Sequence, residues 1–510
     1  MPVRKDISQR VTVSTVRDAY LRGDFERCIA FCDEYRARNG QDEVEVELLR
    51  ARALMPLNRA DSALDVLRRL RLVEGAGDEY LVAKMLTGAA YVKLGHLDRG
   101  LEILRDAHGA AGTAHPTIRA DIAVNLGIAR YRKRQYAQAL AVLQSVPKGA
   151  DIVYARAVLY TAWVAWGQGE YATAADRFEG ALQHIEGCRH YDRYVEAYAL
   201  YGYALLCAEL PRLHLWKPIC ERIARFDWGV TGLALPRFWL MIAASYITEM
   251  LGTMDDARHW ASQAEDSAPS PSCRIVAWCR LAALFGRYGE AGAHAYFVDK
   301  ARERYESLGR EDALREERSL PLTLAEETVQ TSAPDDTEAL LTYYVEVQVP
   351  LLKEDPDEPK LEAYRDFIEA MLYDAHGERT RAQRRYASAF RRFRALGFGR
   401  SASIVAYRLA GLTDDAQYRA FADDALRDAS ASYWVKDRFA QQKFEIRLTA
   451  AQADVLRLVA LGMTNKQIAA ARGISFFRAR NIVADLLAAF GVNNRVDLGR
   501  IAAARSQMTR

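Results

Sequence analysis

The hydrophobic pattern of the chain is repetitive. Through residues 1–300, an apolar stretch and a short turn, often with glycine, precede an aromatic or apolar residue. A small residue and an aliphatic residue then follow it three and four positions later. Strand-like alternation nowhere extends beyond a few positions. The pattern predicts an all-α fold.

The clearest copies of this phrase begin at regular intervals. They read GDFERCI, NRADSAL, GHLDRGL, RQYAQAL and GEYATAA, with anchors at Phe25, Ala60, Leu97, Tyr136 and Tyr171. Successive anchors lie 35, 37, 39 and 35 residues apart. The phrase resembles the tetratricopeptide repeat, whose period is about 34 residues. Such repeats stack into a solenoid with a concave surface, which we expect to bind a protein, a peptide or a small molecule.

Weaker copies continue the array. Anchors at Met254 and Tyr288 lie 34 residues apart, and a degenerate unit surrounds Leu213 and Trp216. The small residue of each copy is expected to let the two helix backbones approach closely.

Proline and acidic residues interrupt the array at 326–336 and 353–360, which predicts loops or a break between sub-arrays. The repeat is restated in residues 370–393, with Ala382 at the small position. We therefore expect a tetratricopeptide-like array over residues 1–325, further degenerate repeats and a linker over 326–440, and a separate domain over 441–510.

Three short helices are predicted in the last domain from their end signals. The start signals are the capping boxes Thr449 with Gln452 and Thr464 with Gln467, and the N-cap candidate Ser475. Glycines 462, 473 and 491 follow the three ends. Helices near 450–461, 465–472 and 476–490 follow, with apolar positions that interlock in a small core.

The same segment carries a specific motif. LTAAQADVLRLVALGMTNKQIAAARGIS followed by FGVNNR resembles the signature of LuxR-type helix-turn-helix domains, from Leu448 to Ala504. The resemblance implies a transcription regulator that reads double-stranded DNA with the 475–490 helix in the major groove. It also implies dimerisation through the helix at 494–504, although that helix alternatively only closes the domain core.

The resemblance assigns candidate DNA contacts. Arg478, Arg480 and Asn481 are base-edge candidates, because arginine pairs with guanine and asparagine with adenine. The phosphate-positioning candidates are Thr464, Asn465, Lys466, Ser475 and Arg495. In the alternative interpretation, Thr464 and Ser475 are only caps and Asn481 is only solvated.

The entrance to the reading helix departs from the family pattern. Phe476 and Phe477 replace polar residues, Arg478-Ala479-Arg480 stands where Thr-Val-Lys is usual, and Ile482 and Ala489 replace the usual His and Lys. The two phenylalanines are able to contact thymine methyl groups, insert at a base step, or pack on a protein. The alternative function is therefore an interaction scaffold whose terminal domain has lost DNA binding.

Charge and composition agree with a folded chain that has a basic end. Half of the residues are hydrophobic and 27% are charged. Residues 445–510 hold ten basic and four acidic side chains, so that segment carries a net charge of +6. The whole chain carries +3, so the residues before this segment carry −3. A basic terminal module on a slightly acidic body is typical of a nucleic-acid contact.

Several kinds of chemistry have no motif in the sequence. There is no phosphate-binding loop and no catalytic constellation, so we expect neither an enzyme nor a cofactor. The chain resembles the sensor and DNA-binding parts of maltose-regulon-type bacterial activators without their ATPase. Seven cysteines without a Cys-x-x-Cys pair suit reduced thiols, and no signal or membrane-spanning segment is seen, so we expect no membrane contact and a cytoplasmic location.

The sequence leaves the roles of three groups of side chains undecided. His184, Cys188, His190 and Asp192 match no standard zinc spacing. The aromatic residues Trp163, Trp166, Tyr194, Tyr198, Tyr201 and Tyr203 either line a ligand groove or fill the seam between repeats. The arginines at 381, 384, 385, 391, 392 and 394 either contact DNA flanks or form a solvated helix face.

Overall fold

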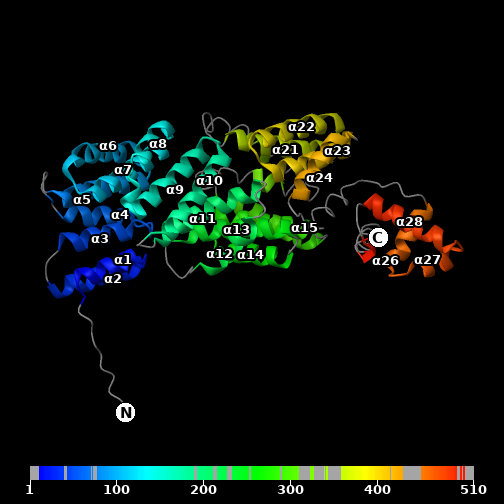
Figure 1. Ribbon diagram of the computed structural model, residues 1–510, viewed down its shortest axis with the longest axis horizontal. Coiled ribbons are helices and arrows are strands. Elements are labelled where there is room, and N and C mark those ends of the chain that lie inside the picture. The colour runs from blue at the N-terminus through cyan, green and yellow to red at the C-terminus, as the bar shows by residue number, and fades with distance from the viewer. Residues whose placement is uncertain are drawn as a thin grey trace, which may run out of the picture.

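The computed structural model is helical throughout the part of the chain that it describes, and its helices form hairpins that stack side by side (Figure 1). The structure describes residues 11–39, 43–70, 72, 77–188, 192–210, 215–226, 233–251, 254–287, 290–308, 322–326, 338, 340–342, 358–413, 415–428, 450–490, 494–496 and 498–499. Within these residues, no helix is long and apolar enough to span a membrane.

The array begins with helix pairs joined by short turns. They are α1 (Val13–Leu21) with α2 (Phe25–Asn39), α3 (Val44–Leu54) with α4 (Ala60–Arg69), α5 (Asp78–Lys93) with α6 (Leu97–Ala110), α7 (Pro116–Arg132) with α8 (Tyr136–Gln144), and α9 (Ile152–Gly167) with α10 (Tyr171–Glu186). Short 3₁₀ turns, η1 (Ala111–Thr113) and η2 (Lys148–Ala150), lie between pairs.

The later pairs continue the same arrangement. They are α11 (Arg193–Glu209) with α12 (Trp216–Arg225), α13 (Ala234–Leu251) with α14 (Met254–Asp266), α15 (Pro271–Arg287) with α16 (Ala291–Ser307), α21 (Glu358–Ala375) with α22 (Arg379–Ala395), and α23 (Gly399–Thr413) with α24 (Ala416–Asp428).

The predicted repeat anchors begin the second helix of their pairs. Phe25, Ala60, Leu97, Tyr136, Tyr171 and Met254 are the first residues of α2, α4, α6, α8, α10 and α14. The small residues three positions later are buried: Cys28, Ala63, Gly100, Ala139, Ala174 and Ala257. The all-α, tetratricopeptide-like array is thus confirmed. Tyr288 and Leu213 lie outside the described residues, as does most of the predicted loops at 326–336 and 353–360.

Close helix approach explains why the position must be small. A Cβ atom on Gly100 in α6 would lie 2.7 Å from the backbone oxygen of Gly88 in α5. Real Cβ atoms do not come this close to a carbonyl oxygen, so only glycine permits this contact between the two helices.

A buried ion network ties the N-terminal pairs together. The Asp121 carboxylate in α7 lies 2.6 Å from Nη2 of Arg156 in α9 and 3.0 Å from Nη2 of Arg52 in α3. Burial by itself raises the pKa of Asp121, but the two guanidinium groups outweigh it and hold the pKa below its ordinary value. Asp121 therefore stays ionised and joins helices from three different pairs.

The C-terminal pairs pack back onto the middle of the array. Residues of α21–α24 share one hydrophobic core with residues of α9–α13, including Phe393, Phe398 and Tyr171. The rings of Tyr171 and Phe398 are 4.8 Å apart between centroids. In Figure 1 the yellow helices accordingly lie against the green ones. The segment after residue 325 thus contributes to the core of the segment before it.

The last described helices form a small three-helix unit. These are α26 (Ala450–Ala460), α27 (Asn465–Arg472) and α28 (Phe476–Phe490), which match the predicted helices closely. Their core contains Val455, Leu456, Val459, Ile468, Ala479, Val483 and Leu486. Gly462 and Gly473 adopt positive φ angles of 76° and 62° after α26 and α27, as the sequence predicts. Thr449, Gly491 and most of the predicted helix 494–504 lie outside the described residues.

Candidate nucleic-acid interface and ligand cavity

The helix α28 presents a polar and aromatic surface to solvent. It follows α27 after the three residues Gly473, Ile474 and Ser475. Ala479 and Val483 face the core, whereas the first turns of α28 expose Phe476, Phe477, Arg478, Arg480 and Asn481. The fold thus brings the three base-edge candidates to one exposed region.

Two phosphate-contact candidates cap helices. The backbone N–H of Gln467 donates to Oγ1 of Thr464 at 3.4 Å, and the backbone N–H of Thr464 donates to Oε1 of Gln467 at 2.8 Å, which completes the predicted capping box. The Ser475 hydroxyl accepts from the backbone N–H of Arg478 at 3.2 Å. Both residues are exposed, so capping and a phosphate contact are compatible at Ser475. The Thr464 hydroxyl also donates to Oε1 of Gln467 at 2.9 Å, and a phosphate contact would replace that bond.

Arg495 and Asn465 contact each other. The Arg495 guanidinium donates to Oδ1 of Asn465 and to the carbonyl oxygen of Met463. These contacts tie the residues after α28 to the start of α27. Burial lowers the pKa of Arg495 from its ordinary value. The sequence motif selects both residues but does not reveal that they are partners.

The remaining basic residues of the unit divide into paired and unpaired groups. Arg472 of α27 forms an ion pair with Asp454 of α26. Lys466, Arg478 and Arg480 are exposed and form no ion pair with another described residue. These three cations are therefore available to an external anion.

The two phenylalanines are both exposed. Phe476 retains 47% and Phe477 67% of its accessible surface. Their ring centroids lie 5.9 Å apart in an edge-on arrangement, and the Arg480 guanidinium lies 5.8 Å from the Phe477 centroid. An apolar pair and a cation thus share the entrance to α28.

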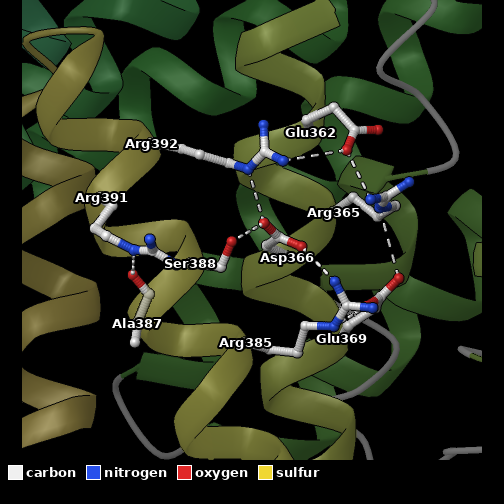
Figure 2. Close-up of polar contacts among 9 residues, drawn as sticks. All are labelled: Glu362, Arg365, Asp366, Glu369, Arg385, Ala387, Ser388, Arg391 and Arg392. Atoms are coloured by element: carbon white, nitrogen blue, oxygen red, sulfur yellow. Dashed lines mark hydrogen bonds and ion pairs between the residues drawn. The ribbon is translucent and has the colours of Figure 1, made fainter.

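Several arginines of the arginine-rich helix α22 form ion pairs with acidic residues of the same chain. Figure 2 shows Arg385 and Arg392 reaching Asp366 of α21, at 2.8 Å and 2.9 Å, while the Ser388 hydroxyl donates to the same carboxylate at 2.7 Å. Asp366 is only 1% exposed. Arg381 pairs with Glu378. Arg385 and Arg392 thus join α22 to α21, so the row is not simply a solvated face.

A cavity of about 520 Å³ lies between the middle of the array and the C-terminal pairs. Most of its residues come from α7, α9, α11 and α13 of the array and from residues 322–326, α21 and α23 of the later segment. The volume lies within the range of small-molecule sites, which is roughly 300–1,000 Å³.

The aromatic side chains between residues 163 and 203 divide between the two predicted roles, lining a ligand groove and filling the seam between repeats. Trp163, Trp166 and Tyr201 line the cavity, and Trp163 lies 5.4 Å from Trp166 and 5.3 Å from Tyr201 between ring centroids. Tyr203 is buried in the core instead. Tyr194 and Tyr198 pack on each other at 4.5 Å.

A partly buried ion pair lies in the cavity wall. Arg400 of α23 forms an ion pair with Glu209 of α11, and the Ser401 hydroxyl donates to the same carboxylate at 2.8 Å. The Tyr364 hydroxyl donates to Glu209 at 3.4 Å. Burial and then the nearby Glu209 charge raise the pKa of Tyr364 well above its ordinary value, so this phenol stays protonated.

The histidine and cysteine group adopts structural roles where it is described. The His184 ring packs edge-on against Tyr154 at 4.8 Å, and the Cys188 thiol donates to the His184 carbonyl oxygen at 3.4 Å. Asp192 caps α11 by accepting from the backbone N–H of Tyr194 at 2.8 Å. His190 lies outside the described residues, and within them no group of three metal-binding side chains is found.

Comparisons with solved structures return helical-repeat proteins. The apo form of RapI has 9% identity and a TM-score of 0.44, with 67% of this chain and 98% of that chain covered. The apo form of the quorum sensor NprR from B. thuringiensis has 12% identity and a TM-score of 0.41, with 74% and 97% covered. A Rap protein complexed with competence and sporulation factor has 12% identity and a TM-score of 0.42, with 75% and 100% covered.

No family model matches the chain, and no curated protein matches its sequence. The description of the repeat array therefore stands on the helix pairs, their buried small residues and their shared core.

Proposed function

We propose that this protein is a DNA-binding transcription regulator whose repeat array receives a signal. The observation that carries the proposal is the exposure of Arg478, Arg480 and Asn481 together on α28, directly after a turn of three residues that contains Gly473. Two helices joined by a turn of 3–4 residues with glycine are typical of the helix-turn-helix motif. The interpretation rests on this geometry and on the LuxR-like motif.

In this proposal α28 enters the major groove. Arg478 and Arg480 donate to guanine edges, and Asn481 pairs with adenine. Lys466 and the hydroxyls of Thr464 and Ser475 contact phosphates at the starts of α27 and α28. Arg495 holds Asn465 in place and thereby orients the start of α27.

A symmetric dimer is the proposed binding form, because two half-sites placed one helical turn apart suit paired reading helices. Val496, which follows α28, is 65% exposed and supplies an apolar contact for a second copy. The regulator is proposed to act in the bacterial cytoplasm. A signal on the array changes DNA binding only if it favours one conformation of the protein over another.

Fluorescence anisotropy of a labelled duplex tests DNA binding by the full-length protein. We expect an affinity that falls steeply as salt rises, because each phosphate contact releases counterions. Arg480→Ala is expected to weaken binding by about tenfold, the effect of losing one good base contact. Arg457→Ala is the matched control, since Arg457 is exposed on α26 and lies off α28. Equal affinities of all three proteins would contradict the proposed role of α28.

One observation favours a second function. The exposed pair Phe476 and Phe477 gives the unit an apolar contact of the kind that binds proteins, so an interaction scaffold that has lost DNA binding is the alternative. A scaffold would show no duplex binding at low salt. A scaffold would lose partner binding in Phe476→Ser/Phe477→Ser and keep it in Arg480→Ala. A regulator would instead lose DNA affinity in Arg480→Ala.

A further inference from the structure

The cavity between α9, α11 and α21 has an unequal distribution of charge. Four basic side chains line it, Arg132, Arg134, Lys360 and Arg400, against two acidic ones, Glu209 and Glu326. Glu209 is already held by Arg400, Ser401 and Tyr364. The cavity therefore has an excess of positive charge at its wall.

Two of these cations are available to a ligand. Arg132, at the end of α7, and Lys360, in α21, form no ion pair with another residue that the structure describes. They come from two different helices that line the cavity. The positive potential near Arg132 is also felt by Lys93, because burial first and the Arg132 charge second lower the pKa of Lys93.

A deeper polar atom also lacks a partner. Nε of Arg400 is buried and forms no hydrogen bond to any described residue, although the same guanidinium is paired with Glu209. An unsatisfied buried N–H costs free energy unless a ligand or water accepts from it.

The other part of the lining is aromatic, with rings that are tilted by 42° to one another. Trp163 and Trp166 are partly exposed and lie 5.4 Å apart between ring centroids, with Tyr201 beside Trp163. Lys360 lies 5.9 Å from the Trp166 ring centroid, so a cation and the aromatic surface are neighbours. Such surfaces favour flat apolar groups that pack against them.

We propose that this cavity binds a small organic anion, whose flat apolar body packs against the rings of Trp163 and Trp166 and whose acidic group is held in the positive potential of Arg132 and Lys360. The site itself follows from the lining residues. The further statement that this anion is the signal for the DNA-binding unit rests on the function proposed above.

Two sources present this chemistry. A free aromatic acid carries both groups in one molecule, and a peptide that ends in an aromatic residue carries them in its terminal carboxylate and its ring. The site recognises the shared pair of groups, and the experiment separates the sources.

Isothermal titration calorimetry of the full-length protein tests the site with matched probes. 2-Naphthoate, 2-naphthylmethanol and 2-naphthylmethylamine share one ring system and differ in charge. We expect 2-naphthoate to bind at least about tenfold more tightly than the other two, and its affinity to fall as ionic strength rises. Acetate, which lacks the ring, is expected not to bind measurably.

Variants locate the binding. Arg132→Ala/Lys360→Gln is expected to weaken 2-naphthoate by about tenfold and to leave 2-naphthylmethanol unchanged, because only the charge contact is lost. Arg274→Ala is the control, since Arg274 is exposed in α15 and does not line the cavity. Far-UV circular dichroism and the thermal midpoint establish that each variant is folded.

A second pair of probes separates the sources. N-acetyl-Gly-Gly-Trp with a free carboxylate is compared with its C-terminal amide. If the peptide with the free carboxylate binds more tightly than 2-naphthoate, a peptide end is the source. If 2-naphthoate binds more tightly than this peptide, a free aromatic acid is the source. In either case the amide is expected to bind more weakly than the acid.

The proposal is overturned if the three naphthalene probes bind equally, if 2-naphthoate does not bind the folded protein at millimolar concentration, or if the double variant behaves like Arg274→Ala. These titrations contain no DNA. Loss of the proposed DNA-binding function would therefore leave a positive result intact, and a negative result here would leave DNA binding standing.

Discussion

Arg400 in α23 donates a hydrogen bond to Glu209 in α11, which lies 191 positions earlier in the chain. The pair joins the C-terminal helix pairs to the middle of the array and forms part of the cavity wall. Burial by itself lowers the pKa of Arg400, but Glu209 together with the Tyr364 and Tyr246 phenols outweighs it and raises the pKa above its ordinary value. The contact between α11 and α23, which are far apart in the sequence, therefore includes a charged pair whose two members stabilise each other.

Breaking this pair is expected to destabilise the fold. Glu209→Gln leaves the Arg400 charge in a mostly buried place without its counter-charge, and such losses cost about 3–5 kcal/mol. We expect a lower midpoint in urea unfolding followed by circular dichroism. Arg38→Ala is the control, because the Arg38–Glu34 pair lies on the exposed surface of α2 and solvent screens it. A midpoint for Glu209→Gln equal to that of the control would contradict this role.

Two glycines in neighbouring helices are expected to respond in opposite directions. A Cβ on Gly202 in α11 would overlap the ring of the fully buried Phe178, so Gly202→Ala is expected to lower the free energy of unfolding by about 1–3 kcal/mol. A Cβ on Gly180 in α10 meets no atom within 4 Å. Gly180→Ala is therefore expected to raise that free energy by about 0.5–1 kcal/mol, because alanine favours the helix. Urea unfolding of both variants is the measurement, and the same sign for both would refute the packing argument.

Lys93 gives the stability of the array a specific pH dependence. Its ammonium group donates to the Met55 carbonyl oxygen at 2.6 Å, and burial lowers its pKa from 10.5 to about 8. Between about pH 8 and 10.5, the unfolded chain holds a proton that the folded protein has released. Unfolding then takes up a proton, so the stability contribution of Lys93 rises as pH increases through this window.

Lys93→Met tests this by removing the titrating group. The thermal midpoint of the wild-type protein, taken relative to the variant at the same pH, is expected to rise from pH 8 towards pH 10.5 and to be level below about pH 7. A midpoint difference that is constant from pH 7 to 10 would show that Lys93 titrates normally.

Features fixed by neighbouring residues were predictable from the sequence. The anchors Phe25 to Tyr171 begin helices as expected, because a turn followed by a small contact residue is a local signal. The Thr464–Gln467 capping box and the positive φ of Gly473 also depend on only a few neighbouring positions. The proximity of Arg478, Arg480 and Asn481 was also predictable, because the three residues lie on one helix.

Features that join distant segments were not predictable in the same way. Nothing near Glu209 indicates that Arg400 pairs with it, and nothing near Trp166 indicates that Lys360 faces the same cavity. The arginines of α22 suggested a contact with DNA flanks or solvent, whereas Arg385 and Arg392 hold a buried aspartate of α21. Each of these contacts depends on how helix pairs stack, which periodicity alone does not determine.

Reading of a DNA sequence by α28 can be tested on genomic DNA. The most direct measurement is the capture of genomic fragments by the full-length protein at moderate salt, repeated with Arg478→Ala/Arg480→Ala. If α28 reads DNA, the wild-type protein enriches one motif and the double variant loses that enrichment. Failure of the wild-type protein to enrich any motif, or retention of the same motif by the variant, would contradict this reading of DNA by α28.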